Sequence, residues 1–242
     1  MEIASSPVRL VLLPGMDGTG ELFEAFIKAL GGAYEIDVIS YPKQTDLGYG
    51  ELKFFIESRL QEKPFVLLGE SFSGPLAVAV AAEQPAGLRG LILSCTFVRN
   101  PRPYLSVFRG LLNLRPAEQI SSDWVTTLLG PFLFNQLPGS DLTKMLGHAL
   151  RQVSPAVMVR RAREVISVDE LEKLKLLQVP VMYLQAEQDR VVPPSSAKLI
   201  QRKLPNMEIV KIPGPHCLLQ ASPVLVAQVV QVFCTRLNWS AL

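Results

Sequence analysis

A single serine stands in a context that suits a nucleophile. Ser71 lies in the segment GESFSG at residues 69–74, between an apolar run at 65–68 and an Ala-rich run that follows Pro75. The first run predicts a buried strand and the second a helix, whose first turn tolerates a proline. A strand that turns directly into a helix strains the backbone at the bend and needs small neighbours, because strand and helix nearly touch there. We therefore expect the Ser71 hydroxyl to project from a sheet edge, beside a helix N-terminus that favours negative charge.

The same segment allows a second interpretation, a turn of small residues with no chemistry. The nucleophile pattern is Gly, any residue, Ser, any residue, Gly. Ser73 occupies the last position here, which keeps the small size and adds a hydroxyl. The choice depends on whether the chain also supplies a base.

A base and an acid follow two later strands. Serine is a poor nucleophile at neutral pH until a base takes its proton, and the chain has only two histidines. His216 and Asp189 each follow an apolar run, and ligands gather at the carboxyl ends of parallel strands. We therefore expect Ser71, Asp189 and His216 to meet at one sheet edge. His216 would be the general base, and Asp189 would hold its tautomer and stabilise the imidazolium.

Rival candidates are weaker. The alternative for His216 is a core or capping histidine, and His148 is interpreted as structural. The strand that precedes the Asp189 strand ends in Ser-Cys-Thr-Phe at 94–97 and so offers no carboxylate. Glu187 stands at the wrong step of the motif and is expected to face solvent.

Strands and helices alternate along most of the chain, which indicates an α/β fold, a parallel sheet with helices on both faces. Strands are predicted at 8–13, 36–41, 65–68, 88–97, 179–186 and 207–212, and helices at 21–30, 49–60, after Pro75, at 195–203 and at 223–236. Between residues 98 and 177 the alternation of strands and helices stops, and helical patterns interrupted by Pro and Gly take its place. We interpret residues 98–177 as an inserted helical cap on a core made of 1–97 and 178–242.

Four motifs carry a family resemblance: LPG and the following glycines at 13–20, GESFSG at 69–74, DRVVP at 189–193 and GPH at 214–216. Together with the order Ser, Asp, His, they resemble an α/β-hydrolase of the serine esterase type over the whole chain. The chain is most similar to small capped carboxylesterases, among them the pimeloyl-carrier-protein methyl ester esterases. The resemblance implies an α/β-hydrolase fold whose cap follows the sixth family strand. The family usually begins with a two-strand hairpin, for which residues 1–7 are too few, so we expect about six mainly parallel strands.

A tetrahedral oxyanion needs preorganised donors. The N–H of Phe72, directly after the nucleophile, is one candidate. The resemblance implies that the N–H of Met16, in the glycine-rich turn after the first strand, is the second. That turn lacks the Gly-Lys-Ser/Thr ending of a phosphate loop, and Asp17 is expected to orient it through local hydrogen bonds.

Composition argues against several other classes. A net charge of +2 predicts no nucleic-acid surface, and no apolar run is long enough to span a bilayer. The first seven residues lack the features of a signal peptide, so none is expected. The three cysteines have no metal-ligand spacing. They predict reduced thiols in a cytoplasmic protein without metal or cofactor.

The residues therefore predict a serine hydrolase that cleaves small-molecule carboxylic esters through an acyl-enzyme. The alternatives are a hydrolase of acyl-carrier-protein esters or thioesters, an acyltransferase, and a non-catalytic binding protein on the same fold. The chain has the complete set of Ser, His and Asp, which argues against a non-catalytic binding protein. Substrate and oligomeric state do not follow from the sequence.

The predicted cap is rich in basic residues. They form either solvated helix faces or a docking surface for an acidic acyl carrier protein. The residues concerned are Arg99, Arg102, Arg109, Arg115, Lys144, Arg151, Arg160, Arg161 and Arg163. Apolar cap residues suit an acyl pocket, and equally suit packing of the cap on the core.

Overall fold

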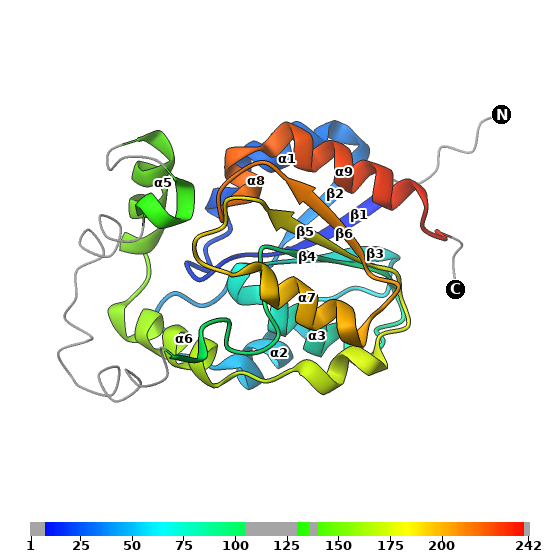
Figure 1. Ribbon diagram of the computed structural model, residues 1–242, viewed down its shortest axis with the longest axis horizontal. Helices are drawn as coiled ribbons and strands as arrows, with labels where there is room; N and C mark the ends of the chain where they lie inside the picture. Colours follow the sequence, from blue (N-terminus) through cyan, green and yellow to red (C-terminus); the bar gives the residue numbers. More distant parts are fainter. Residues whose placement is uncertain (1–7, 105–129, 136–139, 240–242) are drawn as a thin grey trace.

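One parallel sheet forms the centre of the molecule. The computed structural model describes residues 8–104, 130–135 and 140–239 (Figure 1). Six parallel strands are arranged in the order β2-β1-β3-β4-β5-β6. They are β1 (Val8–Leu13), β2 (Tyr34–Val38), β3 (Phe65–Glu70), β4 (Leu88–Ser94), β5 (Val181–Ala186) and β6 (Glu208–Ile212).

Helices cover both faces of this sheet (Figure 1). On one face lie α1 (Glu24–Leu30), α8 (Leu218–Ala221) and α9 (Pro223–Thr235). On the other lie α2 (Tyr49–Glu57), α3 (Gly74–Ala82) and α7 (Pro194–Lys203). The predicted parallel sheet of about six strands with helices on both faces is confirmed.

Side chains of β1 alternate between the two faces. Leu10 and Leu12 belong to the apolar cluster under α1 and α9, whereas Val11 and Leu13 belong to the cluster under α2, α3 and α7. All four are fully buried. A strand covered on both faces is apolar at successive positions, which is why it appears in the sequence as a continuous apolar run.

Two strands end earlier than predicted. β2 spans Tyr34–Val38 instead of 36–41, and the apolar residues that follow form a buried loop in which the Tyr41 N–H donates to the Gly18 carbonyl at 2.8 Å. β4 ends at Ser94 instead of 97, because the backbone turns at Cys95, which has a φ of 47°. Burial outside a strand explains both errors.

The strand order reverses between β1 and β3. The chain passes from β1 to β2 on one side, and then to β3 on the other side of β1. The crevice at the carboxyl ends of two such strands is where open α/β sheets bind ligands. The glycine-rich turn follows β1 and Ser71 follows β3, so both predicted features meet at this switch point.

The described elements between β4 and β5 are helical. They are α5 (Asp141–Arg151), α6 (Pro155–Ser167) and a 3₁₀ segment, η6 (Leu171–Leu176). The side chains of Ser140 and Ser154 cap α5 and α6 by accepting backbone N–H groups at 3.3 Å. Residues 1–7, 105–129 and 136–139, with the predictions that concern them, lie outside the described residues.

Candidate active site

The turn after β3 has the strained backbone expected for a nucleophile. Ser71 has a φ of 50°, in the left-handed region that side-chain-bearing residues rarely adopt. It begins a 3₁₀ turn, Ser71–Ser73, that leads directly into α3. The first N–H groups of this helical segment have no partner within the helix, so they are free to face a ligand at the position of Ser71.

Small residues around Ser71 are required by close contacts. A Cβ on Gly69 would lie 2.7 Å from the Ala77 Cβ and 2.8 Å from the Ser73 carbonyl oxygen. A Cβ on Gly74 would collide with the Thr96 side chain. The predicted contact of strand and helix at this bend is therefore present.

Each of the three residues of the turn is hydrogen-bonded to a residue from elsewhere in the chain. The Thr96 hydroxyl donates to the Ser71 carbonyl, and the Tyr49 hydroxyl donates to the Phe72 carbonyl at 2.8 Å. The Ser73 hydroxyl donates to the carbonyl of Pro14, directly after β1. Ser73, which replaces the usual glycine, thus ties the serine turn to the glycine-rich turn.

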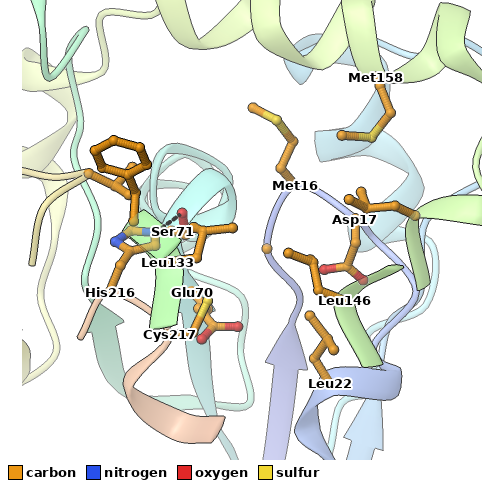
Figure 2. A pocket seen from close by; sticks show the side chains of 14 residues that line it. Met16, Asp17, Leu22, Glu70, Ser71, Leu133, Leu146, Met158, His216 and Cys217 are labelled. Atoms are coloured by element: carbon orange, nitrogen blue, oxygen red, sulfur yellow. Dashed lines mark hydrogen bonds between the residues drawn. The ribbon is translucent and has the colours of Figure 1, made fainter. Parts of the chain in front are cut away.

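Ser71, His216 and Asp189 lie in one hydrogen-bonded chain. Ser71 Oγ is 2.8 Å from His216 Nε2, and His216 Nδ1 is 2.8 Å from Asp189 Oδ2 (Figure 2 shows the first bond). The side chains of His216 and Asp189 are 2 % and 5 % exposed. The structure thus brings together three residues separated by 118 and 27 positions, each of which follows the carboxyl end of a strand.

Both carboxylate oxygens of Asp189 are hydrogen-bonded. Oδ1 accepts the N–H groups of Val191 and Val192, each at 2.8 Å, while Oδ2 faces His216. The backbone bonds fix the carboxylate, and the carboxylate fixes the imidazole with Nε2 directed at the serine hydroxyl. A proton on Nδ1 is the tautomer that this arrangement favours.

The glycine-rich turn is closed by one hydrogen bond, from the Gly18 N–H to the Gly15 carbonyl at 3.0 Å. Met16 and Asp17 are its central residues, whose N–H groups such a bond leaves free. Asp17 Oδ1 accepts from the Thr19 N–H and hydroxyl at 2.8 and 2.6 Å, as predicted for a residue that orients the turn. Met16 and Ser71 line the same pocket.

Arg161 corrects the interpretation of the basic cap. Both alternatives, solvated helix faces and a docking surface, placed Arg161 on an exposed face, but it is 1 % exposed. Its guanidinium donates to the carbonyls of Met16 and Asp17. The helical spacing to Val157 and Met158 places residue 161 on the buried face of α6, and this signal was available in the sequence.

A mainly apolar pocket of about 190 Å³ opens beside Ser71 and His216 (Figure 2). Leu146 and Leu150 come from α5, Met158 from α6 and Leu133 from residues 130–135, so the insertion supplies much of the wall. An apolar cavity of about 150 Å³ accepts benzene. The pocket therefore suits a group somewhat larger than a benzene ring.

One buried carboxyl in this pocket was missed by the sequence analysis. Glu70, directly before Ser71, lines the pocket and is 5 % exposed. Burial raises its pKa to about 8; the hydrogen bond from Gln220 lowers it and the charge of Asp17 raises it. Glu70 Oε1 and Gln220 Oε1 are both buried without a partner among the described residues, and a proton on Glu70 would turn one of these acceptors into a donor.

Other predicted residues are placed as follows. His148 is exposed and lies 3.8 Å from Glu21, and Glu187 faces solvent as expected. Cys95, Cys217 and Cys234 are free thiols, and burial raises the pKa of each. Within the described residues, no group of three or more His, Cys, Asp or Glu could hold a metal ion, and no helix is long and apolar enough to cross a membrane.

Comparisons with known proteins agree with this fold. A model described as the alpha/beta hydrolase family matches residues 10–229. Phytyl ester synthase 1, a chloroplastic protein of Arabidopsis thaliana, is 36 % identical over 109 residues, which are 40 % of this chain. The match spans only 16 % of the length of that relative.

Two further proteins match nearly end to end, one in sequence and one in fold. A pimeloyl-[acyl-carrier protein] methyl ester esterase of Yersinia enterocolitica is 25 % identical over 248 aligned positions, covering 95 % of this chain and 94 % of that protein. The solved structure of an esterase from Exiguobacterium antarcticum has a TM-score of 0.83 at 15 % identity, covering 95 % of this chain and 92 % of that one. The structural likeness shows a shared fold.

Proposed function

Because the chain belongs to the alpha/beta hydrolase family, we propose that it hydrolyses carboxylic esters through an acyl-enzyme formed on Ser71. The observation that carries the proposal is the continuous hydrogen-bond chain from Ser71 Oγ through His216 to Asp189, with both links at 2.8 Å. Nucleophile, base and orienting acid within hydrogen-bond reach are what nucleophilic catalysis by serine requires.

In the first half of the reaction, Ser71 attacks the ester carbonyl while His216 Nε2 takes the hydroxyl proton. The Asp189 carboxylate stabilises the imidazolium. The N–H groups of Met16 and Phe72 bind the oxyanion of the tetrahedral intermediate. The intermediate collapses, and His216 gives its proton to the departing alcohol.

In the second half, water attacks the acyl group on Ser71, and His216 takes its proton. A second tetrahedral intermediate uses the same two N–H donors. Its collapse returns the proton to Ser71 Oγ and releases the carboxylic acid. No cofactor is needed for either half.

The apolar pocket supports an ester with an apolar acyl or alcohol group. We further propose that residues 98–177 act as a cap over a core made of 1–97 and 178–242, because α5 and α6 supply Leu146, Leu150 and Met158 to the pocket wall. Such a cap would exclude water from the chemistry and select the substrate by apolar fit.

Acyl transfer is the second candidate, and one observation favours it. The relative with 36 % identity is a phytyl ester synthase by name, so it forms esters. The same acyl-enzyme serves both reactions, and the outcome depends on whether water or an alcohol enters first. A carrier-protein ester substrate rests on the weaker likeness to the Yersinia enterocolitica esterase.

The test is a panel of p-nitrophenyl esters of rising chain length, with Ser71→Ala as the paired variant. We expect turnover by the wild type, none by Ser71→Ala, and a fluorophosphonate label on Ser71 by mass spectrometry. A label at another residue, or full activity of the variant, would refute the assignment. Repeating the assay with an added long-chain alcohol and quantifying the new ester separates transfer from hydrolysis.

A further inference from the structure

The turn that carries Met16 is held at its far end by the hydrogen bonds from Thr19 to Asp17 Oδ1 and by the Tyr41 N–H, which donates to the Gly18 carbonyl. One backbone hydrogen bond closes it, and Gly18, with a φ of +68°, ends it. An oxyanion donor must be held where the charge will develop, since reorganisation during the reaction weakens stabilisation. The peptide groups of Met16 and Asp17, at the centre of the turn, therefore need a hydrogen-bond partner of their own.

That partner is Arg161 on α6. Its Nη1 donates to the carbonyl of Met16 and to the carbonyl of Asp17, both at 2.8 Å. Its Nη2 donates to the carbonyl of Pro42 at 3.1 Å, in the loop after β2. One guanidinium thus holds the two central carbonyls of the turn and ties them to a neighbouring loop.

The arrangement is tight and energetically demanding. A Cβ on Gly18 would lie 2.5 Å from Nη1 of Arg161, so the glycine leaves the space that the guanidinium fills. Burial lowers the pKa of Arg161, because a buried charge loses its hydration. Arg161 Nε is buried without a partner among the described residues, so the buried charge depends on the three carbonyls that Nη1 and Nη2 bind.

The same helix also lines the pocket. Met158 lies three residues before Arg161, so the two side chains share one face of α6. Figure 2 shows Met158 and Met16 across the pocket from His216. Docking of α6 on the core therefore both completes the pocket wall and fixes the turn.

Resting on the proposed function, we propose that Arg161 is a positioning residue for the oxyanion hole: it fixes the Met16 N–H through the Met16 and Asp17 carbonyls, so that α6 of the cap must be docked for full activity. Arg161 is not among the residues that line the pocket beside Ser71. It acts through the turn, whose displacement by about 1 Å would cost on the order of a hundredfold in rate.

The test compares Arg161→Met with Arg160→Met, a variant at the neighbouring, partly exposed position on the same helix. We expect kcat on a p-nitrophenyl ester to fall by about tenfold to a hundredfold in Arg161→Met, with KM within threefold of the wild type. Arg160→Met should keep wild-type kcat. Arg161→Lys, which retains the charge but not the forked geometry, should lie between wild type and Arg161→Met.

A binding measurement separates positioning from general damage. A trifluoromethyl ketone adds to Ser71 to form a tetrahedral adduct, whereas the matching amide mimics the bound substrate. We expect Arg161→Met to lose affinity for the ketone by the same factor as kcat/KM, and to bind the amide as the wild type does. Equal losses for both ligands, or kcat within twofold of the wild type, would overturn the proposal.

If Arg161→Met does not fold, the same comparison is made with Arg161→Gln and Arg161→Lys, which keep a hydrogen-bond donor. The ketone measurement tests the role of Arg161 separately from the hydrolase assignment. Failure of the wild type to form the ketone adduct at Ser71 would refute the hydrolase assignment. An adduct formed equally well by wild type and Arg161 variants would refute only the role of Arg161.

Discussion

The hydroxyls of Ser73 and Tyr41 lie 2.5 Å apart beneath the serine turn, and both are buried. The Ser73 hydroxyl donates to the Pro14 carbonyl, so the Tyr41 hydroxyl donates to Ser73. Ser73, at the position where the usual pattern has glycine, therefore links the turn after β3 directly to the turn after β1, and Tyr41 joins the loop after β2 to the same hydroxyl. The φ of −84° at Ser73 shows that no glycine is needed there.

This linkage predicts coupled losses of stability. Ser73→Ala leaves the Tyr41 hydroxyl and the Pro14 carbonyl without partners and should lower the free energy of unfolding by about 1–3 kcal/mol. Adding Tyr41→Phe to Ser73→Ala should cost less than Tyr41→Phe costs in the wild type, because the hydroxyl is already unpaired. Urea unfolding of the wild type, the two single variants and the double variant, at unchanged m-value, gives the coupling free energy between Ser73 and Tyr41. Strictly additive losses would contradict it.

The parallel sheet and the proximity of Ser71, Asp189 and His216 could be predicted because their signals are local. Each buried strand is a short apolar run, and Ser71, Asp189 and His216 directly follow such runs at the shared carboxyl edge. The serine turn was predictable for the same reason, since its small residues are neighbours in sequence.

The helical spacing could have placed Arg161 on the buried face of α6, but neither its hydrogen-bond partners nor the burial of Glu70 could be predicted from local signals. Arg161 stands in a run of basic residues and differs from Arg160 and Arg163 only by the face of α6 that it occupies. Its partners, Met16 and Asp17, are about 145 positions away, and only tertiary packing brings them together. Glu70 ends a strand that is buried on both sides, so its burial follows from the sheet order and not from its neighbours.

Replacement of the proposed base and nucleophile should give losses that do not multiply. Ser71→Ala and His216→Ala should lower kcat by similar factors, and the double variant should lose little more, because the two residues act as a unit. Single-turnover and steady-state rates on one p-nitrophenyl ester provide the comparison. Independent, multiplying losses would argue against a shared step.

Asp189→Asn should lower kcat by about four orders of magnitude. Its side-chain oxygen would have to face either His216 or the N–H groups of Val191 and Val192. If the oxygen keeps the two backbone bonds, the amide NH₂ faces His216 Nδ1 and imposes the wrong tautomer. Nε2 then carries a proton and cannot take the one on Ser71. Near wild-type kcat with an unchanged pH profile would remove Asp189 from this role.

Glu70 should make stability fall as pH rises. Its pKa is raised from 4.5 to about 8, so the folded protein holds this proton more tightly than the unfolded chain does. The resulting stabilisation is complete below about pH 4.5 and is lost as pH rises to about 8. Glu70→Gln keeps the shape and does not titrate, so its stability relative to the wild type should increase across that window, by at most about 1.4 kcal/mol per pH unit.

Unfolding midpoints at several pH values check this, with the exposed Glu187→Gln as control. Activity should follow the same group, because an ionised Glu70 beside Ser71 opposes the developing oxyanion. The alkaline decline of kcat should therefore move to higher pH in Glu70→Gln and stay in place in Glu187→Gln. Parallel pH profiles for all three proteins would show that Glu70 is not the titrating group.

The last prediction concerns salt and the basic cap. Within the described residues, Arg99 pairs with Asp169, Lys144 with Asp141 and Arg160 with Glu164. With Arg161 buried as well, much of the positive charge on this surface is neutralised or hidden. We therefore expect kcat/KM to change little between low salt and about 0.3 M salt, where the screening length falls below about 8 Å, for both a p-nitrophenyl ester and an acyl-carrier-protein ester.

Arg109→Glu combined with Arg115→Glu covers two basic cap residues outside the described ranges and should leave KM for the carrier ester unchanged. A steep fall with salt for the carrier ester alone, together with a raised KM in this double variant, would instead identify a docking surface for an acidic carrier, and the small-ester specificity would have to be abandoned.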